Sequence, residues 1–596
     1  MARELPSEAA IRALTTPEVY ERGRSYQRAG AVSGLVARGA EISAAVEGSE
    51  AEPYRVTLRI ADGAVAETRC TCPYEWGGAC KHVVAALLAL RAKPGALAER
   101  PPLREILEPF GRDALADLIL RRAVADSDFA GWIEADLATT VDPDAGRRPI
   151  DTAPVAERTR ALLASPYRRD DYWDGYRTRG NAEALRALVE KAVPFLQVGD
   201  GRNALRVLEA VAGPFVESWT AYGYVDDETD YLLFDDLAAL MAEAALTSDL
   251  TEAERTDLAE TLRAWDDAIG EAFEPVFPVA VRALETGWDE PELDAVLAGA
   301  PGPWPPEDAD LEDLRLTAVR LRVLDGCGRH DAYLNLARAA GAHTRVAAML
   351  VRLGRVGEAV AYAGPTFTKP AESLDLAQTL AAAGRRKEAV AVADAGLTLG
   401  QGQSRDDADW HRGGSPVPLA RWLRETATGT CALRAARVAF ARTLSRDDFD
   451  AVRKPAGRDW PSVRAELLAE LVAAERAPDR PEILLREGLI DEAVASVRDG
   501  PAHTVRDDVL LALMDAAHAR HPDWVIGLAE RRAARIMDEG ATGSYAQAAE
   551  WLRRAALAYE ADGRIDAWSA RIEGLIETHK RKYKLRPLLE DLRFGG

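Results

Sequence analysis

The sequence predicts a mainly α-helical protein that begins with a small α+β domain and continues as a long α-helical repeat region. Three observations predict this fold class. Strand-like alternation is confined to the first hundred residues, the remainder is rich in Ala, Leu, Arg, Glu and Asp, and a glycine-centred turn recurs between helical segments. At 596 residues the chain is too long for one hydrophobic core. We therefore expect a small first domain at 1–95, a helical linker segment at 96–150, a helical domain at 151–305 and a divergent repeat domain at 306–596.

The first domain is predicted as a β-meander with a helix at each end. Residues 17–29 have helical spacing and stop at Gly30, a suitable C-cap residue. A second helix is predicted from His82 to Arg91, before Pro94. Four alternating runs between the helices are separated by glycines and the pair Asp62-Gly63, which favours antiparallel pairing. These runs are 31–36, 41–46, 54–60 and 64–69.

The helical-repeat prediction depends on five turns that share one pattern. Each turn is a glycine that closes one helical segment and is followed four or five residues later by an alanine. The glycines are Gly328, Gly354, Gly384, Gly488 and Gly563. A small alanine allows the second helix to approach the first closely, so that stacked helix pairs bury a continuous core. The spacing is irregular, and the pattern is similar to that of divergent tetratricopeptide arrays.

A cluster of cysteines follows the last predicted strand. Cys70 and Cys72 form a Cys-x-Cys pair, and after seven intervening residues Cys80 and His82 form a Cys-x-His pair. Three thiolates and one imidazole complete the tetrahedral shell of a structural zinc site and leave no position for a catalytic water. We therefore predict that these four residues hold one structural Zn²⁺ ion. Zinc binding of this kind contributes roughly 10 to 16 kcal/mol, so we expect the first domain to depend on the metal.

This cysteine and histidine pattern resembles the SWIM-type zinc finger: Cys-x-Cys, a variable insert, then Cys-x-His. The flanks Cys72-Pro73-Tyr74 and Cys80-Lys81-His82-Val83-Val84-Ala85 also resemble bacterial and archaeal members. The resemblance covers roughly the first 95 residues. It implies a DNA-binding or protein-interaction module, of the kind found in chromatin-type ATPases, transposase-like proteins and recombination-associated proteins. It implies no enzyme activity for the finger itself.

Charge limits where nucleic acid could bind. The formal net charge is −22, which repels phosphate, but the first hundred residues are near neutral, with 13 Lys and Arg against 12 Asp and Glu. The finger offers eight basic and four aromatic residues: Arg22, Arg24, Arg28, Arg38, Arg55, Arg59, Arg69 and Lys81, with Tyr20, Tyr26, Tyr54 and Tyr74. The tail from His579 to Arg586 is a second basic segment. Each has a plain alternative, namely a solvated surface for the finger and a positively charged helix end for the tail.

We predict a non-enzymatic adaptor whose acidic helical-repeat surface binds a protein partner. DNA association through the finger or the basic tail is the first alternative. The second is an unrecognised enzyme between Asp151 and Trp304, where the runs 170–176 and 224–231 gather acidic and aromatic residues. No phosphate loop, dinucleotide fingerprint or nucleophile elbow supports an enzyme.

The cellular setting is predicted from what the sequence lacks. No apolar stretch approaches the length of a membrane span, and the first residues do not resemble a signal peptide. The clustered cysteines favour metal binding in a reducing compartment over a disulfide framework. We therefore expect a cytoplasmic protein without membrane contacts.

Overall fold

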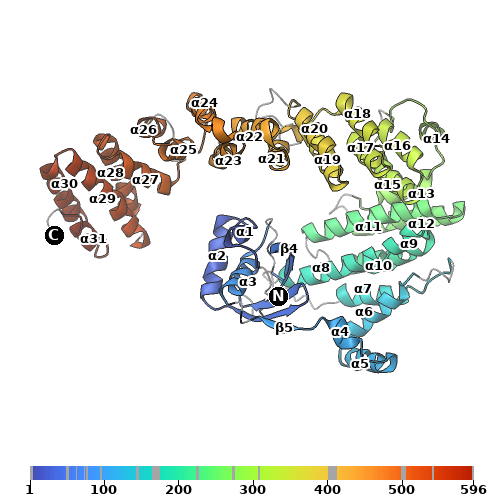
Figure 1. Ribbon diagram of the computed structural model, residues 1–596. Helices are drawn as coiled ribbons and strands as arrows, with labels where there is room; N and C mark the ends of the chain where they lie inside the picture. Colours follow the sequence, from blue (N-terminus) through green and yellow to red (C-terminus); the bar gives the residue numbers. More distant parts are fainter. Residues whose placement is uncertain are drawn as a thin grey trace. The chain divides into compact units, whose positions relative to one another are not determined.

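The computed structural model of the chain is 70% helical, with one small sheet in its N-terminal part (Figure 1). It describes residues 5–48, 53–61, 63–72, 74, 78–93, 95, 97–141, 147–163, 175–222, 227–270, 275–306, 309–399, 413–474, 476–498, 505–539 and 542–593. The chain divides into two compact units, 1–340 and 341–596. A mainly α-helical fold with a small N-terminal sheet domain is thus confirmed.

The predicted meander is confirmed as four consecutive antiparallel strands, β1 Val32–Arg38, β2 Glu41–Val46, β3 Tyr54–Ala61 and β4 Ala64–Cys70. A fifth strand, β5 Ala98–Arg100, pairs in parallel with β1, so that the sheet order is β4-β3-β2-β1-β5. Sequence analysis missed β5 because three residues are too few to show an alternation.

Three helices accompany the sheet: α1 Glu8–Arg12, α2 Pro17–Arg28 and α3 Lys81–Ala92. In β3 the side chains alternate between a buried face, with Val56 and Leu58, and an exposed face, with Arg55 and Arg59. The buried face shares one core with α2 and α3. The two helices approach closely at Gly23, where an added Cβ would lie 2.6 Å from a Val84 side-chain atom. This small core lies directly beside the cysteine cluster.

The rest of the first unit is helical. Its helices are α4 Leu103–Leu107, α5 Arg112–Ala125, α6 Ser127–Ala138, α7 Ala153–Leu163, α8 Gly175–Glu190, α9 Val193–Gln197, α10 Gly201–Tyr222, α11 Asp227–Thr247, α12 Glu252–Ile269, α13 Pro278–Thr286, α14 Pro291–Leu297, α15 Leu311–Gly326 and α16 His330–Ala339. Helix α10 contacts α7, α11 and α12, and α15 contacts α11 and α13. Helices α15 and α16 therefore belong to the first unit, although they follow residue 306, where we placed the start of the repeat domain.

The second unit is a succession of helices. They are α17 His343–Arg352, α18 Val356–Thr366, α19 Pro370–Ala382, α20 Arg386–Gly396, α21 Val417–Thr426, α22 Gly429–Thr443, α23 Arg446–Ala456, η3 Gly457–Asp459, α24 Trp460–Ala473, α25 Arg480–Arg486, α26 Ile490–Arg498, α27 Asp507–Ala517, α28 Pro522–Glu539, η5 Thr542–Ser544, α29 Tyr545–Ala561, α30 Ile565–Thr578 and α31 Arg586–Glu590. Among the described residues, no helix is long and apolar enough to cross a membrane.

Each of the five predicted glycine turns lies between two helices that contact each other. All five glycines have φ between 68 and 78°, a left-handed conformation that other residues rarely adopt. Gly328 lies in the first unit, and the other four lie in the second. The helix–turn–helix pairs are therefore present, whereas their arrangement as a tetratricopeptide-like solenoid stays a prediction.

Candidate metal centre

The four predicted ligands lie together in the finger. Their ligand atoms, three Sγ and one imidazole nitrogen, are all within 4.8 Å of one another. Cys70 Sγ and His82 Nδ1 are 3.8 Å apart. Tetrahedral zinc with ordinary Zn–S and Zn–N bonds places its ligand atoms about 3.6 to 3.8 Å apart. The donor set therefore fits one zinc ion, with His82 as an Nδ1 ligand.

Two elements deliver these ligands. Cys70 is the last residue of β4, and the ladder continues for one more residue because the Thr71 hydroxyl accepts from the Arg55 N–H at 2.9 Å. This bond fixes the turn that carries Cys72. Cys80 is the N-cap of α3, and its Sγ accepts from the Val83 N–H at 3.5 Å. The contact with Cys70 and the Val83 N–H bond lower the pKa of Cys80, but the contact with Cys72 and burial outweigh them and raise that pKa.

The return loop before Cys80 is tied to the turn after α1. Gly78 has φ +74°, and a Cβ there would lie 2.5 Å from the Leu14 carbonyl oxygen. The Ala79 N–H donates to the same carbonyl at 2.8 Å, and the Thr15 hydroxyl donates to the Ala79 carbonyl at 2.6 Å. Glycine is thus required at Gly78. These hydrogen bonds fix the position of the loop that carries Cys80 to the metal site.

His82 is enclosed by aromatic rings and is 2% exposed. Tyr54 stacks on the imidazole with ring centroids 4.3 Å apart, and Tyr26 meets it edge-on at 5.4 Å. Nδ1 faces the thiols, and Nε2 is buried with no hydrogen-bond partner among the residues that the structure describes. A buried, unpaired imidazole destabilises a fold, whereas coordination of Nδ1 to zinc offsets that cost.

The thiols support one another in holding negative charge. Hydrogen bonds from the Cys70 and Cys80 thiols lower the pKa of Cys72, and the same contact with Cys72 raises the pKa of Cys70. One thiolate is thus favoured before metal binds, and the remaining thiols lose their protons as the ion arrives. When bound, a closed Cys₃His zinc shell cross-links β4 to α3 and supplies no catalytic water.

The basic residues proposed for DNA do not form one patch. Arg55, Arg59 and Arg69 lie on the exposed face of the sheet, where Glu67 pairs with Arg59 at 3.0 Å and Arg69 at 3.1 Å. The others, on α2, β1 and α3, include three with partners in the finger: Arg24 with Glu21, Arg38 with the Pro101 carbonyl, and Lys81 with the Tyr26 ring. Tyr20 and Tyr54 are buried and so are not positioned to stack on bases.

Several side chains of the basic tail contact other residues of the second unit. His579 is buried, Lys582 Nζ donates to the Met537 carbonyl in α28, and Lys580 pairs with Glu577. Arg586 opens α31 and bonds Glu590 at 2.8 Å. These contacts favour the interpretation of this segment as a helix end, although Tyr583 is 87% exposed.

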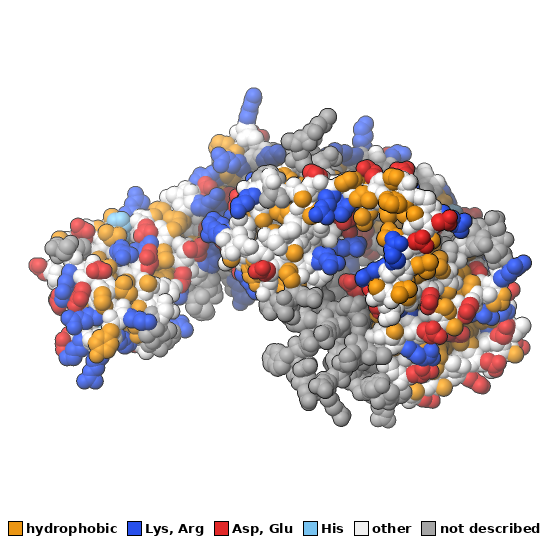
Figure 2. All heavy atoms as spheres, turned by 90° about the horizontal axis from the view of Figure 1, so that it is seen from below, with side chains coloured by type: hydrophobic (Ala, Val, Ile, Leu, Met, Phe, Trp, Pro, Cys, Tyr) orange, Lys and Arg blue, Asp and Glu red, His pale blue; other side chains and the backbone are white. Residues whose placement is uncertain are grey.

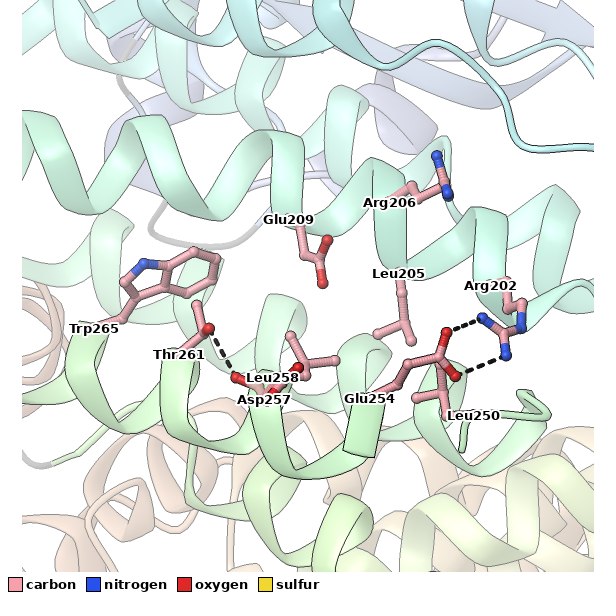
Figure 3. Close-up of a pocket in the computed structure, with 10 residues that line it drawn as sticks. All are labelled: Arg202, Leu205, Arg206, Glu209, Leu250, Glu254, Asp257, Leu258, Thr261 and Trp265. Atoms are coloured by element: carbon pink, nitrogen blue, oxygen red, sulfur yellow. Dashed lines mark hydrogen bonds and ion pairs between the residues drawn. The ribbon is translucent and has the colours of Figure 1, made fainter. Parts of the chain in front are cut away.

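The acidic and aromatic runs of the proposed enzyme region lie partly outside the described residues, at 170–174 and 224–226. The structure shows a different feature in that region, a cavity of about 400 Å³ between α10 and α12 (Figure 3). Its residues are 202, 205, 206, 209, 250, 254, 257, 258, 261 and 265. Sequence reasoning missed it because its two walls are 52 residues apart. Glu254 is held by Arg202, whereas the carboxylates of Glu209 and of the exposed Asp257 have no hydrogen-bond or ion-pair partner among the described residues.

Comparison with known families agrees with the geometry. Residues 54–91 match the family model described as SWIM zinc finger. Neither the comparison with curated proteins nor that with solved structures found a match. The match spans β3, β4, the four ligands and most of α3. The chain therefore contains a SWIM zinc finger domain at residues 54–91, in which Cys70, Cys72, Cys80 and His82 are positioned to bind one zinc ion.

Proposed function

We propose that the protein is a non-enzymatic adaptor, in which the zinc-stabilised finger is joined to a helical scaffold that binds a protein partner. In this proposal the helix pairs joined by glycine turns stack as repeats, because stacked repeats offer long surfaces for such contacts. A basic protein segment that also carries apolar side chains best fits the exposed surface of α4, α5 and α6.

The observation that carries this proposal is the apolar surface of α4, α5 and α6. Leu120 is 60% exposed and Val124 is 90% exposed, and no residue of α5 is buried. The other large exposed apolar residues of this segment are Leu103, Ile106, Leu107, Phe110, Leu118, Ile119, Trp132 and Leu137. Apolar groups gathered on a surface in this way mark contact sites for other proteins.

The distribution of charge indicates the sign of the partner. Residues 101–305 hold 41 Asp and Glu against 19 Lys and Arg, whereas residues 306–596 hold 44 against 43. The acidic excess therefore lies in the earlier helical segment, and we propose the partner-binding surface on that segment instead of on the helical-repeat domain 306–596. Figure 2 shows both signs of charge interspersed on one face of the molecule. Because α4 to α6 lie within the acidic segment, we assign a basic, partly apolar partner.

A matched pair of double variants tests this surface. Leu120→Ser with Val124→Ser alters α5, and Leu311→Ser with Leu314→Ser alters two exposed leucines of α15 as the control. Cross-linked capture from a cell extract should lose basic partners only with the α5 variant. Identical partner sets for both variants, or self-association of the wild type through α5 in sedimentation, would contradict the proposal.

The second candidate is DNA association at the open face of the finger's sheet. It is favoured by the three arginines there, Arg55, Arg59 and Arg69, in a domain that is near neutral, unlike the acidic segment 101–305. Phosphate contacts would give an affinity that falls steeply with salt. Binding of the full chain to single- and double-stranded DNA across a salt series tests this. A steep salt dependence that is reduced by Arg55→Ser would support DNA association, and the absence of binding at low salt would leave the adaptor.

A further inference from the structure

The cavity between α10 and α12 lies between two helices whose contacts keep a constant sequence separation. Arg202 bonds Glu254 near the start of both helices, and farther along Gly213 faces Trp265, where an added Cβ would lie 3.7 Å from the indole. Both pairs are separated by 52 residues, so the two helices run in the same direction in register. Between these two contacts the helices line an open cavity of about 400 Å³ (Figure 3). This volume is within the range of small-molecule sites, roughly 300 to 1,000 Å³.

Most of the lining is either apolar or already paired. Leu205, Leu250, Leu258 and the Trp265 indole supply the apolar wall. Trp265 is held in place by Phe277, at 5.7 Å between ring centroids. The cavity thus offers a surface for an alkyl chain, closed at one end by an aromatic ring.

The polar groups at the other end are satisfied. The Arg202 guanidinium donates to both Glu254 oxygens at 2.8 and 2.9 Å and to Asp249 at 2.6 Å. This double engagement lowers the pKa of Glu254 to about 2. The Thr261 hydroxyl donates to the Asp257 carbonyl at 2.9 Å. The Arg202 guanidinium is therefore fully engaged, whereas Arg206, the other arginine of the lining, is exposed and has no partner among the described residues.

Glu209 is the most buried of the three unpaired charged groups in the lining. Its carboxylate points from α10 into the cavity (Figure 3) and makes no hydrogen bond or ion pair with any residue that the structure describes. Burial raises the pKa of Glu209, and the charge of Arg206, one turn earlier, opposes that shift only in part. Asp448, by contrast, is a buried carboxylate with four partners. A half-buried carboxylate without a partner is a site that a cation would stabilise.

We propose that this cavity binds an alkyl chain with a terminal ammonium or guanidinium group. Glu209 pairs with the cation, and the leucines and Trp265 contact the methylene chain. The acidic charge of residues 101–305 attracts such a ligand. Two sources share this chemistry, a free diamine and a lysine or arginine side chain of another protein. The inference does not depend on the adaptor proposal, because a free amine tests it.

Calorimetric titration of the full chain is the direct test. The probes are n-pentylamine and n-pentanol, which share the alkyl chain and differ in the charged group. Wild-type protein should bind the amine at least about tenfold more tightly than the alcohol, because hydrogen bonds to charged groups are the stronger kind. Glu209→Gln should weaken amine binding by a similar factor and leave alcohol binding unchanged. The matched control is Glu260→Gln, an exposed glutamate of α12 that does not line the cavity.

Equal affinity for amine and alcohol, unchanged amine binding in Glu209→Gln, or no amine binding to the wild type at millimolar concentration would each overturn the proposal. A thermal unfolding midpoint of Glu209→Gln that is equal to or higher than that of the wild type shows that lost binding is not lost folding. Two further probes, 1,5-diaminopentane and a blocked Gly-Lys-Gly peptide, separate the sources. Tighter binding of the diamine assigns a free amine, and tighter binding of the peptide assigns a partner's side chain.

Discussion

The finger and the second unit differ in whether the protein itself satisfies the polar groups that converge in its interior. In the second unit, Asp448 is 1% exposed, and Arg421 and Arg424 bond its carboxylate at 2.7 and 3.0 Å. The hydroxyls of Thr443 and Ser445 complete the set at 2.8 and 3.1 Å. In the finger, three thiols and an imidazole converge, and among the described residues their polar side-chain partners are one another. A polar cluster that the chain itself satisfies stabilises the fold, whereas a cluster left unsatisfied marks the place of a ligand.

The sharpest way to break this comparison is to remove one finger ligand. Cys80→Ser should abolish zinc binding and unfold the finger, because zinc contributes roughly 10 to 16 kcal/mol to such sites, comparable with the whole stability of a small domain. The helical circular dichroism signal should be almost unchanged, since most helices lie beyond residue 100. Elemental analysis of the purified chain measures the zinc.

The control for this change is Cys327→Ser, an exposed cysteine outside the cluster, which should keep one zinc per chain. Full zinc occupancy in Cys80→Ser would show that the four-ligand assignment is wrong.

Removing the charge of Asp448 tests the other side of the comparison. Asp448→Asn should destabilise helices α21 to α23 by about 3 kcal/mol, because Arg424 would lose its buried counter-charge. Hydrogen exchange of these helices measures the loss. Asp450→Asn, at a half-exposed ion pair with Arg486, should cost less than about 1 kcal/mol. Equal effects of the two substitutions would remove the distinction between a buried and an exposed pair.

The ionised state of Asp448 also predicts that the stability lost in Asp448→Asn depends on pH. Burial alone would raise the pKa of Asp448, but hydrogen bonds from Arg421 and Thr443 outweigh it and lower that pKa. A lowered carboxyl pKa contributes stability above the unfolded value of about 4, and this contribution is lost as the pH falls below it. The difference between wild type and Asp448→Asn should therefore shrink in acid. A difference that is constant down to pH 3 would contradict this origin.

A smaller effect is expected from crowding the histidine ligand. In Gly48→Ala the new Cβ would lie 2.3 Å from a Tyr54 ring carbon and 3.3 Å from His82 Nε2, so the stacked pair must shift. We expect a loss of about 1 to 3 kcal/mol in finger stability and weaker zinc retention against a chelator. Gly95→Ala, where nothing lies within 4 Å, is the control and should be neutral. Unchanged retention in Gly48→Ala would show that the tyrosine does not position His82.

The smallest effect concerns the unpaired carboxylate of α10. Because burial raises the pKa of Glu209, its ionised form destabilises the folded state at neutral pH. Glu209→Gln should therefore be stabilising at pH 7 by less than about 1 kcal/mol, and this gain should vanish below about pH 4, where the carboxyl is protonated in both states. Thermal unfolding at the two pH values measures it. Destabilisation at pH 7 would mean that Glu209 has a structural partner.

The sequence by itself determined the metal site and the local elements. Short-range spacing placed Cys70, Cys72, Cys80 and His82 around one ion, because a strand end and a helix start fix four ligands within thirteen residues. The alternation of apolar residues fixed the four meander strands. The glycine at each predicted turn adopts the left-handed conformation that only glycine adopts easily.

Only the tertiary structure decided the remaining features, because each of them depends on which residues lie close together in the folded protein. The cavity requires that α10 and α12 align 52 residues apart, which no periodicity reveals. The exposed apolar face of α5 has the composition of an ordinary core helix, and its exposure is known only once the packing is known. Tyr54 and Tyr26, which the sequence offered as base-stacking rings, instead enclose His82. Sequence patterns fix local geometry, whereas which side chains meet across the fold is set by the packing of elements far apart in the chain.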